Sequence, residues 1–168
     1  TAKLFREINP GLKLFAETSG KNSMIITPNA DLDLAAKDLA YSAFGHAGQK
    51  CSAASVAILV GSVAKSKRFM RQLEDAVKSI HVAHPQDPMA QMGPVIEAPS
   101  GKLLEGLTSL EPGESWLLEP KKLDDSGKLW SPGIRTGVRP GSKSHKTEYF
   151  GPMLSVMTAR SLEDALAL

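Results

Sequence analysis

Residues 45–60 read GHAGQKCSAASVAILV and hold the only cysteine of the chain, Cys51, just before an apolar run, Val56–Val60. An apolar run of this kind, closed by Gly61, is typical of a strand buried on both faces of a parallel sheet. The residues around the cysteine are small or polar, whereas a structural cysteine usually packs among apolar side chains. Glycines here allow a tight backbone, and Lys50 would favour the nucleophilic thiolate. We therefore predict a reactive cysteine on a loop that leads into a buried strand.

Helical and strand patterns alternate on the N-terminal side of this stretch. A helix is predicted over Leu32–Phe44, with Asp31 as its N-cap and Gly45 as its end, because its apolar residues recur at helical spacing. Short strands are predicted before it, at residues 13–18 and 23–27. The cysteine loop is thus expected to leave the C-terminus of a helix.

The same alternation continues after the apolar run. Helices are predicted over residues 63–80 and 100–110, and a last helix begins at Ser161. Strand patterns recur at residues 115–119, 133–138 and 153–158. Residues 1–8 are interpreted as a helix, and residues 84–94 and 121–128 as loops. This order predicts an α/β domain with a mostly parallel open sheet flanked by helices.

Size and composition favour one ordinary globular domain. The chain has 168 residues, of which 42% are hydrophobic and 23% charged, and its net charge is +2. The basic residues are scattered, which argues against a nucleic-acid partner. No apolar run reaches the length that a membrane span needs, and a single cysteine suits a reducing compartment. We expect a cytoplasmic protein without a membrane span.

Three side chains could assist the cysteine, and each has an ordinary alternative. Glu17 could activate water against a covalent intermediate, or it could be a solvated acid at a strand end. His46 could pair with Cys51 in a cysteine hydrolase, although such a histidine is more often a packing or capping group. Glu148 could hydrogen-bond a sugar hydroxyl or lie on the surface. The histidines lack zinc-type spacing with Cys51, so no metal site is predicted.

Three blocks of the sequence resemble the aldehyde dehydrogenase superfamily and occur in its order. They are Phe15–Lys21, which is similar to the family's Glu-Leu-Gly-Gly-Lys block, then Gly48–Cys51 and Glu148–Pro152. The interval between Glu17 and Cys51 also matches that of the family. The resemblance covers essentially the whole chain and implies an aldehyde-dehydrogenase-type catalytic domain.

Finer detail resembles one branch, the L-glutamate γ-semialdehyde (1-pyrroline-5-carboxylate) dehydrogenases of proline catabolism. The segments that carry this likeness are Phe15–Asn22, Ala43–Ala53 and Gly113–Glu119. Some members of the branch are fused to a proline dehydrogenase. In this branch a serine after the catalytic cysteine, here Ser52, contacts the substrate α-carboxylate.

The resemblance implies a role for each of the remaining candidate residues. The Cys51 thiolate would attack the aldehyde to give a thiohemiacetal, hydride would pass to NAD or NADP, and Glu17 would activate water to release the acid. Glu148 would hold the nicotinamide ribose, with Phe150 near the ring. Thr18 and Ser19 would line the nicotinamide side.

The resemblance also implies that residues 1–168 form a catalytic domain without the family's NAD-binding domain and C-terminal end. We expect such a fragment to fold without oxidising aldehydes, and the parent enzyme to form a homo-oligomer. Two other interpretations remain open beside the cysteine hydrolase. They are an aldehyde dehydrogenase with another substrate and a non-catalytic interaction domain that retains the fold.

Overall fold

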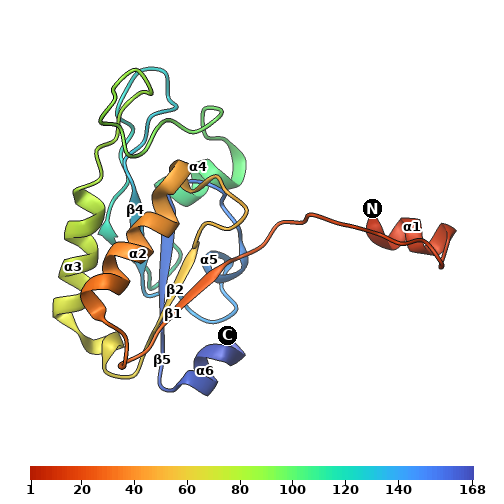
Figure 1. The fold of residues 1–168 in the computed structure, drawn as a ribbon, viewed down its shortest axis with the longest axis horizontal. Coiled ribbons are helices and arrows are strands. Elements are labelled where there is room, and N and C mark those ends of the chain that lie inside the picture. The colour runs from red at the N-terminus through yellow and green to blue at the C-terminus, as the bar shows by residue number, and fades with distance from the viewer.

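A computed structural model describes residues 1–168 as a sheet with helices on both faces and an N-terminal arm that stands away from it (Figure 1). The strands lie in the order β1 (Ser23–Ile26), β2 (Val56–Val60), β5 (Met153–Ala159), β4 (Gly133–Thr136) and β3 (Ser115–Leu118). The first four are parallel, and β3 is antiparallel to β4. The predicted α/β fold with a mostly parallel sheet is confirmed.

The strand β2, which lies between β1 and β5, is buried along its whole length, as its unbroken apolar sequence predicts. Side chains alternate between faces along a strand, so Ala57 and Leu59 join one core cluster while Val56, Ile58 and Val60 join another. Its neighbour β5 pairs with it from Val56 opposite Ser155 to Val60 opposite Ala159. The chain therefore builds its core around β2, directly after the cysteine loop.

Two long helices cover one face of the sheet. They are α2 (Leu32–Phe44) and α3 (Lys67–Lys78), which bury apolar side chains such as Phe44, Phe69 and Leu73 in the larger cluster. Asp31 caps α2 as predicted, with its carboxylate accepting from the N–H groups of Asp33 and Leu34. The helix α3 begins later than predicted, because residues 63–65 form a 3₁₀ turn, η2, and Ser66 then caps α3.

Short helices complete the structure. The helix α6 (Leu162–Ala167) packs Ala165 against the other face of the sheet, and α4 (Gly101–Thr108) packs Leu107 beside Trp130 and Met153. The four-residue helix α5 (Lys143–Lys146) was not predicted, since so short a segment has no apolar period to detect. None of the helices is both long and apolar enough to cross a lipid bilayer.

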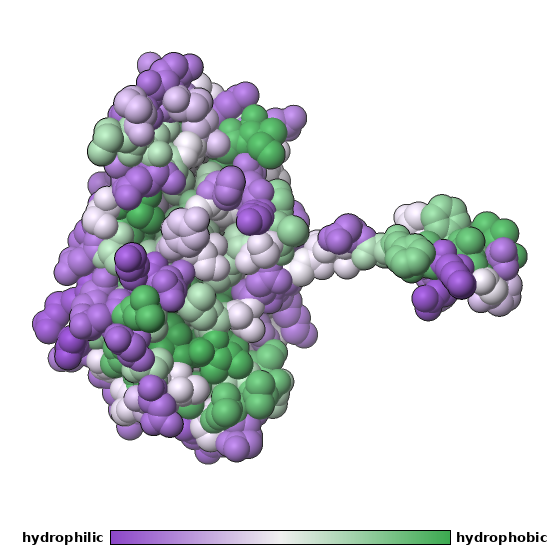
Figure 2. Space-filling view, viewed as in Figure 1, coloured by the Kyte–Doolittle hydropathy of each residue, from purple (hydrophilic) through white to green (hydrophobic).

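The N-terminal arm corrects one prediction. Helix α1 (Ala2–Ile8) buries no residue, and the extended segment after it, in which Phe15 is 95% exposed, runs free until β1 (Figure 1). The strand predicted at residues 13–18 is wrong, because this segment has no neighbouring strand to complete a hydrogen-bond ladder. Figure 2 shows apolar residues on the arm and around α6, where Leu162 and Leu166 are exposed.

Candidate active site

Three segments that are distant in sequence meet at the amino end of the sheet. Asn22 directly precedes β1, the cysteine loop (residues 45–55) precedes β2, and the 147–152 segment precedes β5. Because β1, β2 and β5 are adjacent and parallel, the segments that enter them lie at the same edge. The topology therefore brings Cys51, Glu148 and Phe150 to one end of the molecule.

The backbone of the cysteine loop turns sharply at its start. The 3₁₀ turn η1 (Gly45–Gly48) follows α2, and His46, Ala47 and Gly48 all have positive φ, of 54°, 54° and 65°. A side chain at Gly48 would place its Cβ only 2.1 Å from the carbonyl oxygen of Gly151. Glycine is required here because the loop packs directly against the backbone of the 147–152 segment.

Asn22 holds the cysteine loop from the β1 side. Its side-chain amide donates to the carbonyl oxygens of Cys51 at 2.5 Å and Ala53 at 3.1 Å. Its own carbonyl oxygen accepts from the N–H groups of Ser55 and Val56. The side chain and backbone of Asn22 thus hold the loop from the nucleophile candidate to the start of β2.

Gln49 holds the loop from the opposite side. Its Nε2 donates to the carbonyl oxygen of Phe150 at 3.1 Å, and its Oε1 accepts from the N–H of Ile96 at 2.9 Å. Phe150 has a φ of 57°, an uncommon conformation for a residue with a side chain. The Gln49 side chain therefore connects the cysteine loop to the segment that carries Glu148 and Phe150.

The loop presents unpaired groups to solvent. Cys51 is exposed, and so is Ser52. The backbone N–H groups of Lys50, Cys51 and Ser52 donate to no acceptor within the chain. An exposed thiol beside free N–H donors is an arrangement that can bind an oxyanion formed when sulfur attacks a carbonyl.

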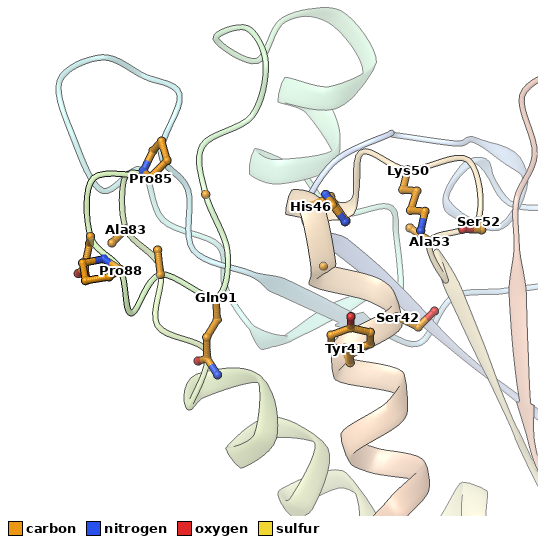
Figure 3. Close-up of a pocket in the computed structure, with 14 residues that line it drawn as sticks. Tyr41, Ser42, His46, Lys50, Ser52, Ala53, Ala83, Pro85, Pro88 and Gln91 are labelled. Atoms are coloured by element: carbon orange, nitrogen blue, oxygen red, sulfur yellow. The ribbon is translucent and has the colours of Figure 1, made fainter.

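A half-open groove of about 650 Å³ runs along one side of the loop (Figure 3). One wall comes from the end of α2 and the cysteine loop, with Tyr41, His46, Lys50 and Ser52. The other wall comes from the loop at residues 83–93. Lys50 and Ser52 make the end of the groove next to Cys51 suitable for a small ligand that carries a negative charge, whereas the opposite wall carries Asp87, which pairs with His81.

A smaller hollow lies on the other side of the loop, lined by residues that include Lys21, Gly48, Lys50, Glu148 and Phe150. Glu148 is half-buried and the Phe150 side chain is 37% exposed. Between them Tyr149 is buried, and its hydroxyl lies 3.2 Å from the Ser144 hydroxyl. The buried ring anchors the two outward-facing neighbours.

A buried ion pair supports Tyr149 from below. Arg135 donates to the Glu114 carboxylate at 3.1 Å and to the Ser144 hydroxyl at 2.7 Å, and both charged side chains are 1% exposed. Its guanidinium lies 5.1 Å from the Tyr149 ring centroid. Lys21 lies over the same ring at 5.2 Å. Burial of Lys21, together with the Arg135 charge, lowers its pKa to about 8, against the opposing attraction of Glu148 and Glu114.

The other three predicted site residues lie in the arm. Glu17, Thr18 and Ser19 are exposed and make no hydrogen bond or ion pair with the rest of the chain. The structure therefore does not bring Glu17 against Cys51. Their segment nevertheless ends at Asn22, which is hydrogen-bonded to the cysteine loop. Because five residues of extended chain span at most about 17 Å, Glu17 stays within that distance of Asn22.

The cysteine hydrolase interpretation has no support from the geometry. The His46 side chain is exposed and has no carboxylate or amide hydrogen-bonded to it that would orient its ring. No group of three or more His, Cys, Asp or Glu side chains is arranged to hold a metal ion.

Sequence reasoning did not assign roles to Asn22, Gln49, Lys21 and Arg135. Asn22 and Gln49 lie inside the quoted blocks, but nothing in the local pattern shows that Gln49 reaches a partner 101 residues away. Arg135 gave no signal, because a single arginine in a strand pattern is more often exposed.

Comparisons with known proteins agree on one family. The family described as "Aldehyde dehydrogenase family" matches residues 5–168. The 1-pyrroline-5-carboxylate dehydrogenase of Bacillus subtilis (strain 168) is 35% identical over 170 residues, which cover 96% of this chain and 32% of that protein. The chain thus spans about a third of the length of this curated relative.

Solved structures give the same result. Proline Utilization A from Corynebacterium freiburgense matches with a TM-score of 0.89 and 55% identity, covering 99% of this chain and 17% of that one. A putative methylmalonate-semialdehyde dehydrogenase from Sinorhizobium meliloti 1021, complexed with NAD, matches with a TM-score of 0.78 and 36% identity, covering 89% and 31%.

Proposed function

The chain belongs to the aldehyde dehydrogenase family, and we propose that it is the cysteine-bearing catalytic part of an NAD(P)-dependent enzyme that oxidises L-glutamate γ-semialdehyde to glutamate. The observation that carries the proposal is the cysteine loop itself. Cys51 is exposed between the Asn22 and Gln49 tethers, with free backbone N–H groups beside its sulfur. Relatives that act in proline metabolism, by their names, support the choice of substrate.

In the proposed mechanism the Cys51 thiolate forms a bond with the carbonyl carbon of the aldehyde. The carbonyl oxygen becomes an oxyanion and accepts a hydrogen bond from the free Cys51 N–H, which is held in place before the reaction starts. Ser52, on the wall of the groove, would donate to the α-carboxylate of the substrate, and the Lys50 charge would favour the same anion. Cysteine suits this role because its sulfur is both a good nucleophile and a good leaving group.

The hollow itself has room for about one water molecule, but the side chains at its rim fit one side of a nicotinamide nucleotide. Glu148 offers a carboxylate for a ribose hydroxyl, and the exposed Phe150 ring offers a flat apolar face. Thr18 and Ser19 would line the same side once the arm folds over the loop. When bound, NAD(P) supplies the hydride acceptor. Its remaining contacts would come from a domain outside this chain, which agrees with the third of the relative's length that the chain covers.

Glu17 would act after the acyl group is attached to Cys51. Its carboxylate would take a proton from a water molecule whose oxygen attacks the thioester carbon, and the C–S bond then breaks to release the acid. This step requires the arm to turn back toward the loop from the Asn22 tether. No hydrogen bond between residues 13–19 and the sheet opposes this turn, and contacts with the rest of the enzyme would hold the arm there.

Another semialdehyde is the second candidate substrate, since the methylmalonate-semialdehyde dehydrogenase is 36% identical to this chain. The two substrates differ at the end that Ser52 would contact, because only L-glutamate γ-semialdehyde carries an α-amino group beside its carboxylate. The groove is roomy enough for either. Competition between them therefore tests the substrate choice directly.

The single cysteine makes the test unambiguous. We would alkylate Cys51 with iodoacetamide and measure, by mass spectrometry, how L-glutamate γ-semialdehyde, methylmalonate semialdehyde and propanal protect it. N-acetylcysteine serves as the control for intrinsic thiol reactivity. We expect strong protection by L-glutamate γ-semialdehyde in wild type, weaker protection in Ser52→Ala, and little protection by propanal.

Each other outcome identifies the part that is wrong. Equal protection by all three aldehydes would support attack of Cys51 on aldehydes but refute L-glutamate γ-semialdehyde as the preferred substrate. Protection no better than that of N-acetylcysteine would refute the role of Cys51 as the catalytic nucleophile. NADH formation by this chain alone would show that it needs no further domain.

A further inference from the structure

Lys21 stands out among the lysines because its side chain is half-buried, whereas every other lysine is exposed. It lies at the base of the arm, next to Asn22, and makes no hydrogen bond or ion pair. By contrast, Lys78 pairs with Glu74 at 2.6 Å, and Lys143 pairs with Glu105. Lys21 lines the groove of about 420 Å³ beside α5 and α6, so a small aldehyde can approach it from that side. The hollow beside the cysteine loop, which Lys21 also lines, has room for about one water molecule.

Burial and a neighbouring cation both favour the neutral form of the Lys21 amine. The Arg135 guanidinium and the Lys21 amine lie 5.1 and 5.2 Å from the ring centroid. The Arg135 guanidinium is held by the buried Glu114 carboxylate. Burial and, after it, repulsion from Arg135 therefore lower the pKa of Lys21, so that its amine releases a proton more easily than an ordinary lysine.

We propose that Lys21 is a modification site for small aldehydes, in which its neutral amine forms an imine beside the cysteine loop. The nitrogen lone pair bonds to the carbonyl carbon, and the carbonyl oxygen takes up the proton that the nitrogen loses. Loss of water from this carbinolamine leaves the imine, so the step needs no oxidant or reductant. The proposal is independent of the activity proposed for Cys51, although both groups would meet the same class of molecule.

The surrounding charges fix how the site responds to pH. The burial and the Arg135 charge lower the pKa of Lys21 to about 8, while Glu148 and Glu114 oppose this shift. Lys50 faces the same hollow, and His145 and Lys146 of α5 line the groove on the other side. The adduct should therefore accumulate as the pH rises through 8, well below the range in which exposed lysines react.

Reductive alkylation with propanal and cyanoborohydride tests the proposal on the intact chain. At pH 7.5 the neutral fraction of an amine with a pKa near 8 is about 200-fold that of an ordinary lysine, and its lower basicity offsets roughly tenfold of this advantage. We expect Lys21 to be propylated at least about 20-fold faster than Lys78 and Lys143, as measured by peptide mass spectrometry.

Two variants test whether fast labelling of Lys21 comes from its lowered pKa or only from its accessibility. Glu148→Gln removes an attraction that raises the pKa of Lys21, so its labelling midpoint should move to lower pH, while the midpoint of Lys143 should stay unchanged. Lys21→Arg should lose the fast-labelled site without creating another. Labelling of Lys21 no faster than that of Lys143, or a midpoint that ignores Glu148→Gln, would overturn the proposal. Circular dichroism of each variant checks that the fold is retained.

Discussion

At the scale of single residues, the lowered pKa of Lys21 reduces the free energy of unfolding by an amount that depends on pH. Its pKa of about 8 lies below the ordinary value of 10.5, so the unfolded chain binds more protons than the folded chain between these values. Stability linked to this group therefore rises as the pH increases from 8 to 10.5, and the cost is fully present below pH 8.

Lys21→Met should remove this cost while keeping a side chain of similar length. We expect the variant to gain up to about 3 kcal/mol in the free energy of unfolding at pH 7, and the gain to shrink toward pH 10. Urea unfolding of both proteins from pH 7 to 10 measures it. A difference that stays constant over this range would show that the Lys21 amine titrates normally.

Asn22 is the second residue whose contribution can be measured. Asn22→Ala removes two donors from the carbonyl oxygens of Cys51 and Ala53, which should lower the free energy of unfolding by about 1–3 kcal/mol. Hydrogen exchange in residues 50–55 should become faster as the loop loosens. Asn29→Ala is the matched control, because Asn29 is exposed and its side chain makes no hydrogen bond. Equal effects of the two substitutions would refute the tether.

At the scale of the elements, Arg135 joins four parts of the structure. From β4 it reaches Glu114 before β3, Ser144 of α5 and the carbonyl oxygen of Gly106 in α4. Arg135→Met would leave the Glu114 carboxylate buried without its partner, and we expect a loss of about 3–5 kcal/mol. Adding Glu114→Gln should restore part of this stability. Thermal and urea unfolding of both variants test it, and a single-variant loss below about 1 kcal/mol would contradict the role of the pair.

The elements also show how far the sequence could predict the structure. The strand β2 and the helix α2 were predictable, because an unbroken apolar run and a capped helical period are local signals. The strand expected at residues 13–18 fails because pairing depends on a partner that local sequence does not reveal. Cys51 could be identified from its neighbours in the sequence, whereas the residues that hold its loop, Asn22 and Gln49, could not. The Gln49–Phe150 contact exists only because β2 and β5 are adjacent.

At the scale of the whole molecule, the candidate site lies at the amino end of the parallel strands. Ligands in open α/β sheets usually bind beyond the carboxyl ends, so the general rule would point to the opposite edge. The difference follows from where the loops are anchored, since Asn22, the cysteine loop and the 147–152 segment all lead into strands. The free arm leaves from this same edge (Figure 1).

The arm itself supports the last prediction. Residues 1–12 bury nothing, and a helix as short as α1 is marginal on its own, so deleting them should change the free energy of unfolding by less than about 0.5 kcal/mol. The same residues expose Leu4, Phe5, Ile8 and Leu12, and apolar surface of this kind favours association. We therefore expect wild type to associate at high concentration in sedimentation experiments, and the deletion variant, which retains Glu17, to associate less. A destabilised variant would mean that the arm packs on the sheet in solution. Unchanged association would instead mean that the molecules associate through the apolar residues around α6, because the exposed Leu162 and Leu166 remain in the variant.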